Sequence, residues 1–171
     1  MQRAIDDPSW GRRNNPEAEA NIGRLLDHWR ARGWPVIHVQ HVSREPGSTF
    51  RPGQPGVDFK PATAPRPGEL VVVKHTPSAF AATQLAALLE EHNVRALVIT
   101  GFITNNSVET AVRVAATEGF EVTVVDDATA TFDRRDRDGR LWRAEEVHAL
   151  SLSNLSGEYA RVCGTADLLD R

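Results

Sequence analysis

Short runs of consecutive apolar residues alternate along the chain with longer segments whose apolar positions recur every three or four residues. The runs cover residues 35–40, 69–74, 95–100, 121–126 and 159–163. Continuous apolar runs bounded by turn residues are typical of strands buried on both faces, as in a parallel sheet between helices. The alternation predicts an α/β fold, a three-layer α/β/α sandwich with a mainly parallel sheet and a ligand site at the carboxyl ends of its strands.

The first helix is predicted between Asn15, as its N-cap, and Gly33, where it ends, with Pro16 at the first helical position. Five apolar residues share one face of this helix: Ala18, Ile22, Leu25, Leu26 and Trp29. Further helices are expected over residues 78–93, 106–119 and 144–157. The first helix needs a sheet beneath its apolar face, yet only turn-rich sequence precedes it, so one strand is lacking from the predicted set.

Two irregular segments interrupt this pattern. Residues 41–68 join two predicted strands by a connection much longer than usual, and such loops tend to be active-site walls or disordered insertions. Phe50, Val57 and Phe59 give this loop apolar surface to pack, which favours a wall. Residues 133–140 form a charged segment that includes three Asp, but the ligand spacing of a calcium loop fails there, which favours a solvated turn.

Composition restricts the class of protein. A chain of 171 residues, 40% of them hydrophobic, is long enough for one buried core, and we read residues 1–171 as a single domain. The net charge of −3, without clustered Lys and Arg, argues against a nucleic-acid or membrane surface and favours a small-molecule substrate. Cys163 is the single cysteine, and its place on a late strand suggests a small core residue. With no apolar leader or membrane-length run, we expect a cytoplasmic protein.

The segment "VITGFITNNSVET", residues 98–110, is the strongest candidate for chemistry. It reads as a buried strand that turns past Gly101 into a helix whose start carries Ser107. Small polar groups at such a turn suit an acyl-transfer nucleophile and its anion hole. They equally suit a helix cap, so both interpretations stay open at this point.

Three separated motifs, taken together, resemble the isochorismatase-like, or cysteine hydrolase, superfamily. They are "MQRAIDDPSW", "VVVKHTPSAF" and "LVITGFITNNSVETAVRVAATEGFEVTVVDDATATF", which occur in the family's order, and the similarity extends from residue 1 to about 168. The resemblance implies a Rossmann-like sandwich that hydrolyses a small molecule without a cofactor. It also implies a homo-oligomer, a dimer or tetramer, with the long loop and the C-terminal helices at the interface.

The resemblance assigns roles to individual residues. Lys74 matches the family's catalytic lysine, and Ser107 stands where the family has its cysteine nucleophile. Gly101 and Thr104 match the glycine and threonine of the same turn, with Thr104 a part of the anion hole. Met1 and Gln2 match the last two residues of an Asp-x-Gln element.

The aspartate of that element would immediately precede Met1, and it is not in this sequence. We therefore expect the lacking strand and the aspartate to lie upstream of an initiation site assigned too far downstream, with a truncated gene product as the alternative.

The resemblance also implies the surroundings of the reacting group. The family holds its oxyanion with backbone N–H groups beside a non-proline cis peptide, which corresponds here to the Phe102–Ile103 bond, with Ile103 and Ser107 as donors. Trp10 stands where family members often place an aromatic residue against the substrate, and we expect His41 to form a polar part of the pocket wall.

His38 and His41 are spaced i and i+3, which on a strand places them on opposite faces, so no metal site is predicted. Arg44 in the long loop is a candidate partner for a substrate carboxylate, with solvated surface as the other interpretation.

Three classes of functional hypothesis remain open: a hydrolase, with two possible chemistries, a ligand-binding relative and a structural protein. Ser107 acts as a nucleophile if burial lowers the pKa of Lys74 enough to make it a base, although nothing visible in the sequence orients Lys74 without the aspartate. Family members without the cysteine resemble vinyl-ether hydrolases, whose aspartate is a general acid. A ligand-binding relative without turnover, or a purely structural protein, would use neither chemistry.

Overall fold

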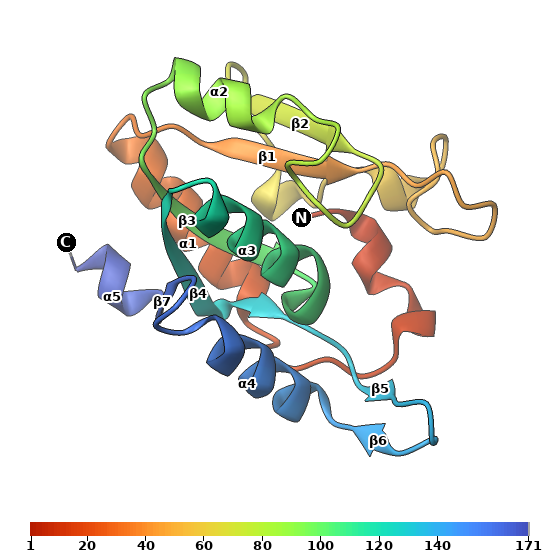
Figure 1. Ribbon diagram of the computed structural model, residues 1–171. Helices are drawn as coiled ribbons and strands as arrows, with labels where there is room; N and C mark the ends of the chain where they lie inside the picture. The colour runs from red at the N-terminus through yellow and green to blue at the C-terminus, as the bar shows by residue number, and fades with distance from the viewer. Residues whose placement is uncertain (171) are drawn as a thin grey trace.

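A computed structural model describes residues 1–170 as a three-layer sandwich, with helices on both faces of parallel strands, which confirms the predicted α/β class (Figure 1). The strands are β1 (Ile37–His41), β2 (Leu70–Lys74), β3 (Ala96–Phe102), β4 (Glu121–Ala130), β5 (Arg134–Arg135), β6 (Leu141–Trp142) and β7 (Arg161–Cys163). The α-helices are α1 (Ala18–Ala31), α2 (Leu85–Glu91), α3 (Glu109–Thr117), α4 (Ala144–Leu155) and α5 (Ala166–Leu169). None of the helices in residues 1–170 combines the length and the apolarity needed to span a bilayer.

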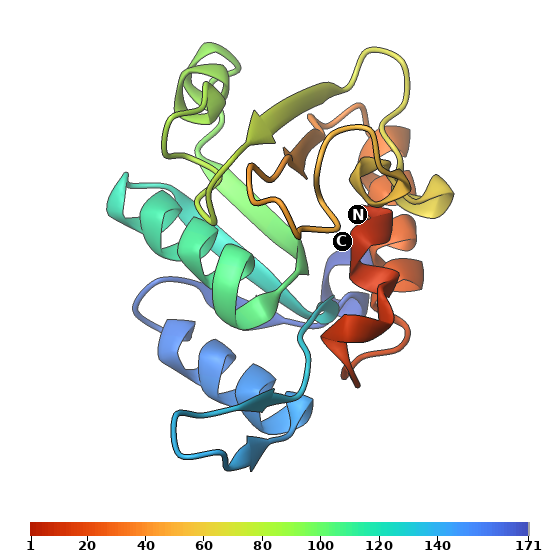
Figure 2. The same ribbon diagram turned by 90° about the vertical axis from the view of Figure 1, so that its right-hand side faces the viewer.

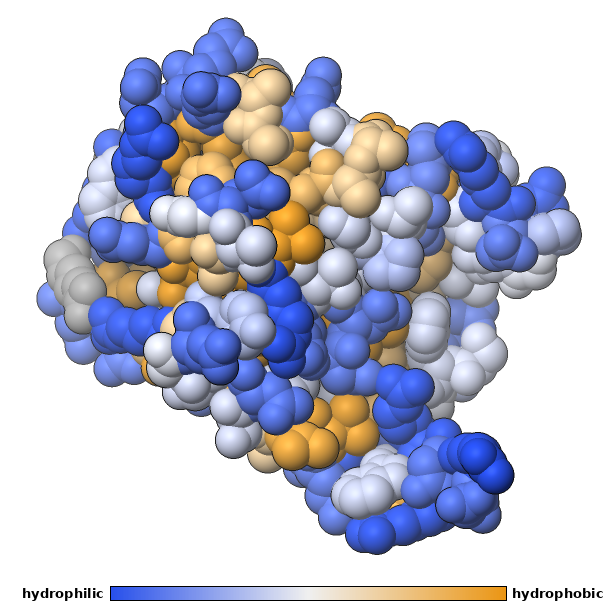
Figure 3. Space-filling view, in the orientation of Figure 1, coloured by the Kyte–Doolittle hydropathy of each residue, from blue (hydrophilic) through white to orange (hydrophobic). Residues whose placement is uncertain are grey.

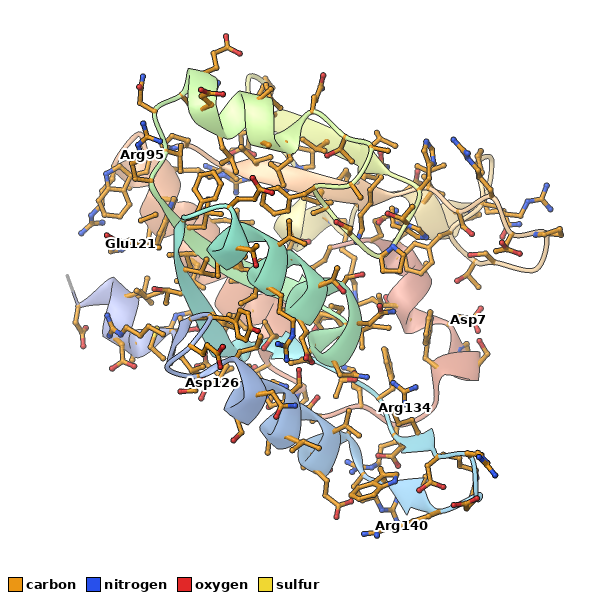
Figure 4. The ribbon with its side chains drawn as sticks, viewed as in Figure 1. Asp7, Arg95, Glu121, Asp126, Arg134 and Arg140 are labelled. Atoms are coloured by element: carbon orange, nitrogen blue, oxygen red, sulfur yellow. The ribbon has the colours of Figure 1, made fainter. Side chains whose placement is uncertain are left out.

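The parallel strands form two sheets rather than the single sheet predicted. β1 pairs with β2, while β4 lies between β3 and β7; β5 and β6 form a small antiparallel hairpin. Arg95 and Glu121 mark the amino ends of β3 and β4, on the opposite side of the molecule from Asp7 (Figure 4). Within residues 1–170 no strand joins β1 to β3, and the division of the sheet follows from this.

Helices α2, α3 and α4 cover one face, and α1 and α5 cover the other (Figure 2). Val124 and Val125 of β4 show why the strands read as continuous apolar runs, since both are fully buried but on opposite faces. Val124 packs with residues of α3 and α4, and Val125 packs with residues of α1 and α5. Cys163 lies in the second of these cores, as expected of a small core residue.

Helix α2 is shorter than predicted, because it begins at Leu85 rather than at Ser78. The Ser78 hydroxyl accepts hydrogen bonds from the N–H groups of Phe80 (3.2 Å) and Ala81 (3.0 Å). Such local side-chain bonds offer the backbone an alternative to the helical ladder. The predicted helix end is confirmed by Asn93, which follows α2 with a φ of 53° in the left-handed region.

The predicted N-cap of α1 is wrong. Asn15 precedes the helix by three residues, and its Nδ2 donates to the carbonyl oxygens of Asp126 (2.8 Å) and Thr129 (2.7 Å). The side chain therefore fastens the approach to α1 onto β4 instead of capping the helix.

Candidate active site

A cavity of about 1030 Å³ opens at the carboxyl ends of the strands and extends between β1 and β3. At the carboxyl end its lining includes six of the predicted site residues: Trp10, His41, Lys74, Phe102, Ile103 and Ser107. The long loop contributes Arg44, Phe50 and Phe59 to the lining, which confirms that it forms a wall. The residues that the resemblance singled out are far apart in the sequence, and the structure places them around one cavity.

Lys74 ends β2 with its side chain buried against the turn that follows. Its Nζ donates to the carbonyl oxygen of Pro77 at 2.6 Å and lies 3.0 Å from the Ser107 Oγ. The expectation that nothing orients Lys74 is therefore wrong, because a backbone carbonyl of the next turn does so. Burial lowers the pKa of Lys74 from 10.5 to about 8. At pH 7 the Lys74 side chain is then a neutral amine, able to accept a proton, in about one tenth of the protein molecules.

Ser107 lies in a turn that leads from β3 into α3. The Phe102–Ile103 peptide bond is cis, as the resemblance implied, and residues Thr104–Val108 form a single π-helical turn. The Val108 N–H donates to the Ile103 carbonyl oxygen at 3.1 Å, so Ser107 precedes the donor of the first helical bond. Donors at a helix start favour an anion, whichever side chain stands at the start.

The structure corrects the expected place of Thr104 among the groups of the anion hole that face the substrate. Its side chain is fully buried behind the turn, and its Oγ1 lies 2.9 Å from the Nδ1 of His148 in α4. Thr104 therefore fastens the turn to the helix layer and does not line the cavity. Asn106, which sequence reasoning left as a helix-start residue, does line it.

Aromatic side chains form the rim of the site. Trp10 stacks on Phe132 with ring centroids 5.3 Å apart, and its Nε1 donates to the Ala4 carbonyl oxygen at 2.9 Å. The rings of His41 and Phe50 pack in a T-shaped arrangement with their centroids 5.3 Å apart. Phe132 follows β4 and ends the third quoted motif, but no role was predicted for it from the sequence. The rim offers flat apolar surface beside the Lys74–Ser107 contact, which suits a small substrate with an apolar body.

The two histidines of the "HVQH" segment have different surroundings. Burial, together with the charge of Lys74, lowers the pKa of His41 and so favours its neutral imidazole. The His38 Nε2 lies 2.8 Å from a carboxylate oxygen of Glu69. Within residues 1–170 no three His, Cys, Asp or Glu side chains come together in a way that could hold a metal ion.

Gly56 lies where two parts of the long loop, residues 41–68, approach each other closely. A Cβ at this position would collide with the Thr49 carbonyl oxygen and lie 3.1 Å from the Ala4 side chain. We expect Gly56→Ala to lower the free energy of unfolding by about 1–3 kcal/mol in urea titrations, because a backbone oxygen must move. The matched control is Gly47→Ala in the same loop, where nothing lies within 4 Å; a loss of the same size there would contradict this account.

Comparison with known proteins then identifies the family. The model of the isochorismatase domain matches residues 1–167. The chain belongs to the isochorismatase family. An isochorismatase-family structure from Chromobacterium violaceum is 56% identical, with a TM-score of 0.96 over 99% of this chain and 88% of that chain. The isochorismatase family protein YrdC of Bacillus subtilis is 37% identical over 99% of this chain and 91% of its own length.

The isochorismatase family relatives include a named enzyme. Streptothricin hydrolase of Streptomyces noursei is 35% identical over 69% of this chain and 44% of its own length. The chain is thus an isochorismatase-family hydrolase, and this confirms the class predicted from its motifs.

Proposed function

We propose that this hydrolase cleaves a small-molecule amide or activated ester by acyl transfer, with Ser107 as the nucleophile, Lys74 as the general base and no cofactor. The observation that carries the proposal is the 3.0 Å contact between the Lys74 Nζ and the Ser107 Oγ. A buried lysine with a lowered pKa can activate a serine hydroxyl, which is too weak an acid to ionise alone. The relative named for streptothricin hydrolysis supports a hydrolytic reaction on a small molecule.

In the first half of the reaction, Ser107 attacks the carbonyl carbon of the substrate. The neutral Lys74 amine takes the hydroxyl proton while the new carbon–oxygen bond forms. The negative charge that develops on the carbonyl oxygen is held by the N–H groups of Ile103 and Ser107. Lys74 then returns its proton to the leaving nitrogen or oxygen, the scissile bond breaks, and an ester to Ser107 remains.

In the second half, water attacks this ester. Lys74 takes one proton from the water, the same N–H groups hold the second oxyanion, and the bond to Ser107 breaks. Lys74 gives the proton back to the Ser107 oxygen, which restores the starting state. The carboxylic acid leaves, and no group besides water is consumed.

The contact between Lys74 and Ser107 supports acyl transfer, because the hydroxyl that would attack and the amine that would accept its proton are already within hydrogen-bond distance.

The pH dependence tests the role of the lysine. With p-nitrophenyl acetate as the probe, kcat/KM is expected to rise through a pKa of about 8 and level off above it. The reason is that only neutral Lys74 accepts the Ser107 proton, and it is neutral above its pKa. Stopped assays from pH 6 to about 9.5, corrected for spontaneous hydrolysis, would measure this profile.

A flat profile would contradict the lysine as general base. Binding of ester or amide probes without any turnover across this range would favour the ligand-binding relative instead, and would contradict the proposed hydrolysis.

A further inference from the structure

Helix α4 directs one polar side chain inward, toward the turn that carries Ser107. The outward positions of α4 include Glu145, Glu146 and Ser153, and hydrophilic side chains prevail over this helix and the β5–β6 hairpin in Figure 3. His148, in contrast, is only 9% exposed. A buried imidazole is costly unless its nitrogens are paired, so its partners indicate why it lies inside.

One nitrogen of the His148 ring contacts the turn, and the other faces β4. The Nδ1 lies 2.9 Å from the Thr104 Oγ1, and the Nε2 lies 3.5 Å from the Asn15 Nδ2. The two hydrogens of that amide are already donated to the carbonyl oxygens of Asp126 (2.8 Å) and Thr129 (2.7 Å). The Asn15 side chain therefore has no hydrogen left to donate to the imidazole.

These contacts assign the hydrogen of the neutral ring to Nε2. Burial has the largest effect on the pKa of His148 and lowers it, which favours the neutral imidazole. The carboxylate and the backbone carbonyl of Asp126 act in the opposite direction, because a carbonyl oxygen stabilises an N–H that points toward it. With the donor on the β4 side of the ring, the Nδ1 is the acceptor, and the Thr104 hydroxyl donates to it.

The buried side of the turn is anchored at two successive residues. Besides Thr104, which is fully buried, Asn105 accepts a hydrogen bond through its Oδ1 from the Thr131 Oγ1 at 2.5 Å. Thr131 follows β4, and its N–H donates to the Asn14 side chain at 2.8 Å. Hydrogen bonds fix the direction of a group, whereas apolar contacts mainly fill space. The turn is thus tied to α4 on one side and to the chain after β4 on the other.

The other side of the same turn presents to the cavity the groups that acyl transfer needs. Ile103 and Ser107 both line the cavity, and Ile103 immediately precedes Thr104. The Ile103 carbonyl oxygen accepts from the N–H groups of Asn106 and Val108, at 3.1 Å each. Rotation of the backbone at Thr104 would break these bonds and redirect the Ile103 N–H. A donor that points away from the developing oxyanion stabilises it less.

We propose that His148 is a positioning residue for the anion hole: its neutral ring accepts the Thr104 hydroxyl and thereby fixes the direction of the Ile103 N–H. The inference rests on the proposed acyl transfer, in which both halves of the reaction pass through an oxyanion. No proton moves to or from His148 in either half. Loss of the bond should therefore lower kcat and leave KM unchanged, because the oxyanion forms only in the reaction itself.

The test removes the bond from each side and then from both. With p-nitrophenyl acetate at pH 9, Thr104→Val and His148→Phe are each expected to lower kcat by ~10- to 100-fold. The double variant should lose no more than either single variant, because both changes remove the same bond. Thr104→Ser and His148→Asn keep a hydroxyl and an acceptor at these positions and should retain most of the activity. A loss in the double variant equal to the product of the two single losses would overturn the proposal.

Leu155→Val is the matched control, since Leu155 is buried in the same helix about two turns beyond His148. It should lower Tm and leave kcat unchanged. A loss of kcat as large as that of Thr104→Val would show that any damage to α4 has this effect, and it would overturn the proposal. If His148→Phe does not fold, the comparison of Thr104→Val with Thr104→Ser decides, and equal kcat for these two variants would overturn the proposal.

Nuclear magnetic resonance separates this proposal from hydrolysis itself. The amide resonance of Ile103 should shift in Thr104→Val but stay near its original position in Thr104→Ser. The nitrogen resonances of the His148 ring should place its hydrogen on Nε2. If the unaltered chain turns over no ester, the proposed hydrolysis fails, and these resonances still decide whether His148 fixes the Ile103 N–H. An unmoved Ile103 resonance in Thr104→Val, or a hydrogen on Nδ1, would overturn the proposal.

Discussion

Ser107→Ala is expected to lower kcat toward p-nitrophenyl acetate by at least ~1000-fold, with folding unchanged. The reason is that the hydroxyl supplies the atom that becomes bonded to the substrate. The other hydrogen-bond partner of the Lys74 Nζ in residues 1–170 is the Pro77 carbonyl oxygen, which is not a nucleophile. Initial rates at pH 9, where Lys74 is mostly neutral, would measure the loss.

Ser153→Ala is the matched control, because Ser153 is exposed on α4 and lies outside the cavity lining. Its activity should equal that of the unaltered chain. A Ser107→Ala protein that retains activity within a few-fold would exclude Ser107 as the nucleophile. Ser107→Cys should stay active and work at lower pH, since a thiol beside a positive charge ionises more readily than a hydroxyl.

Lys74→Arg and Lys74→Met are both expected to lower kcat by ~100- to 10,000-fold and to remove the step in the pH profile near 8. Arginine keeps the positive charge but does not lose its proton in this range, so it cannot accept the Ser107 proton. Methionine removes both charge and base. Comparing pH–rate profiles of the two variants separates a base from a fixed charge, and an active Lys74→Arg protein would contradict the base.

The stability of the Lys74→Met protein provides a check on folding. The pKa of Lys74 in the folded protein, about 8, lies below the value of 10.5 that it has in the unfolded chain. The unfolded chain therefore binds more protons between these two pH values. The free energy of unfolding of the unaltered chain should therefore rise with pH across this window, and this contribution should vanish in Lys74→Met.

The sequence predicted the site better than it predicted the contacts that hold it. Lys74 was singled out because it matches a motif in residue type, and Ser107 because it occupies the cysteine position of another motif; strand ends in a parallel sheet bring the two together. The carbonyl of Pro77, which orients Lys74, leaves no such trace, because any residue supplies a carbonyl oxygen. Thr104 was assigned to the anion hole because the motif fixes its position in the sequence but not the direction of its side chain, which packs against His148.

Helices and strands were predicted correctly where burial determines the pattern of apolar residues. Their boundaries were missed where individual side-chain hydrogen bonds determine the backbone path. The strand runs and the end of α2 at Asn93 appear in the structure, since both rest on core packing and left-handed backbone geometry. Asn15 and Ser78 are residue types that favour helix starts, yet each bonds elsewhere: Asn15 to β4, and Ser78 to the turn after it. A competing partner far along the chain, such as Asp126, is invisible to a local pattern.

The central claim is that Ser107 forms a covalent bond with the substrate, and intact-protein mass spectrometry tests it most directly. After a brief exposure to p-nitrophenyl acetate and an acid quench, the chain is expected to gain the mass of one acetyl group, and peptide mapping should place it on Ser107. The Ser107→Ala protein should gain none under the same conditions. An acetyl group found elsewhere, or turnover of the ester with no adduct at Ser107 at any quench time, would contradict the account.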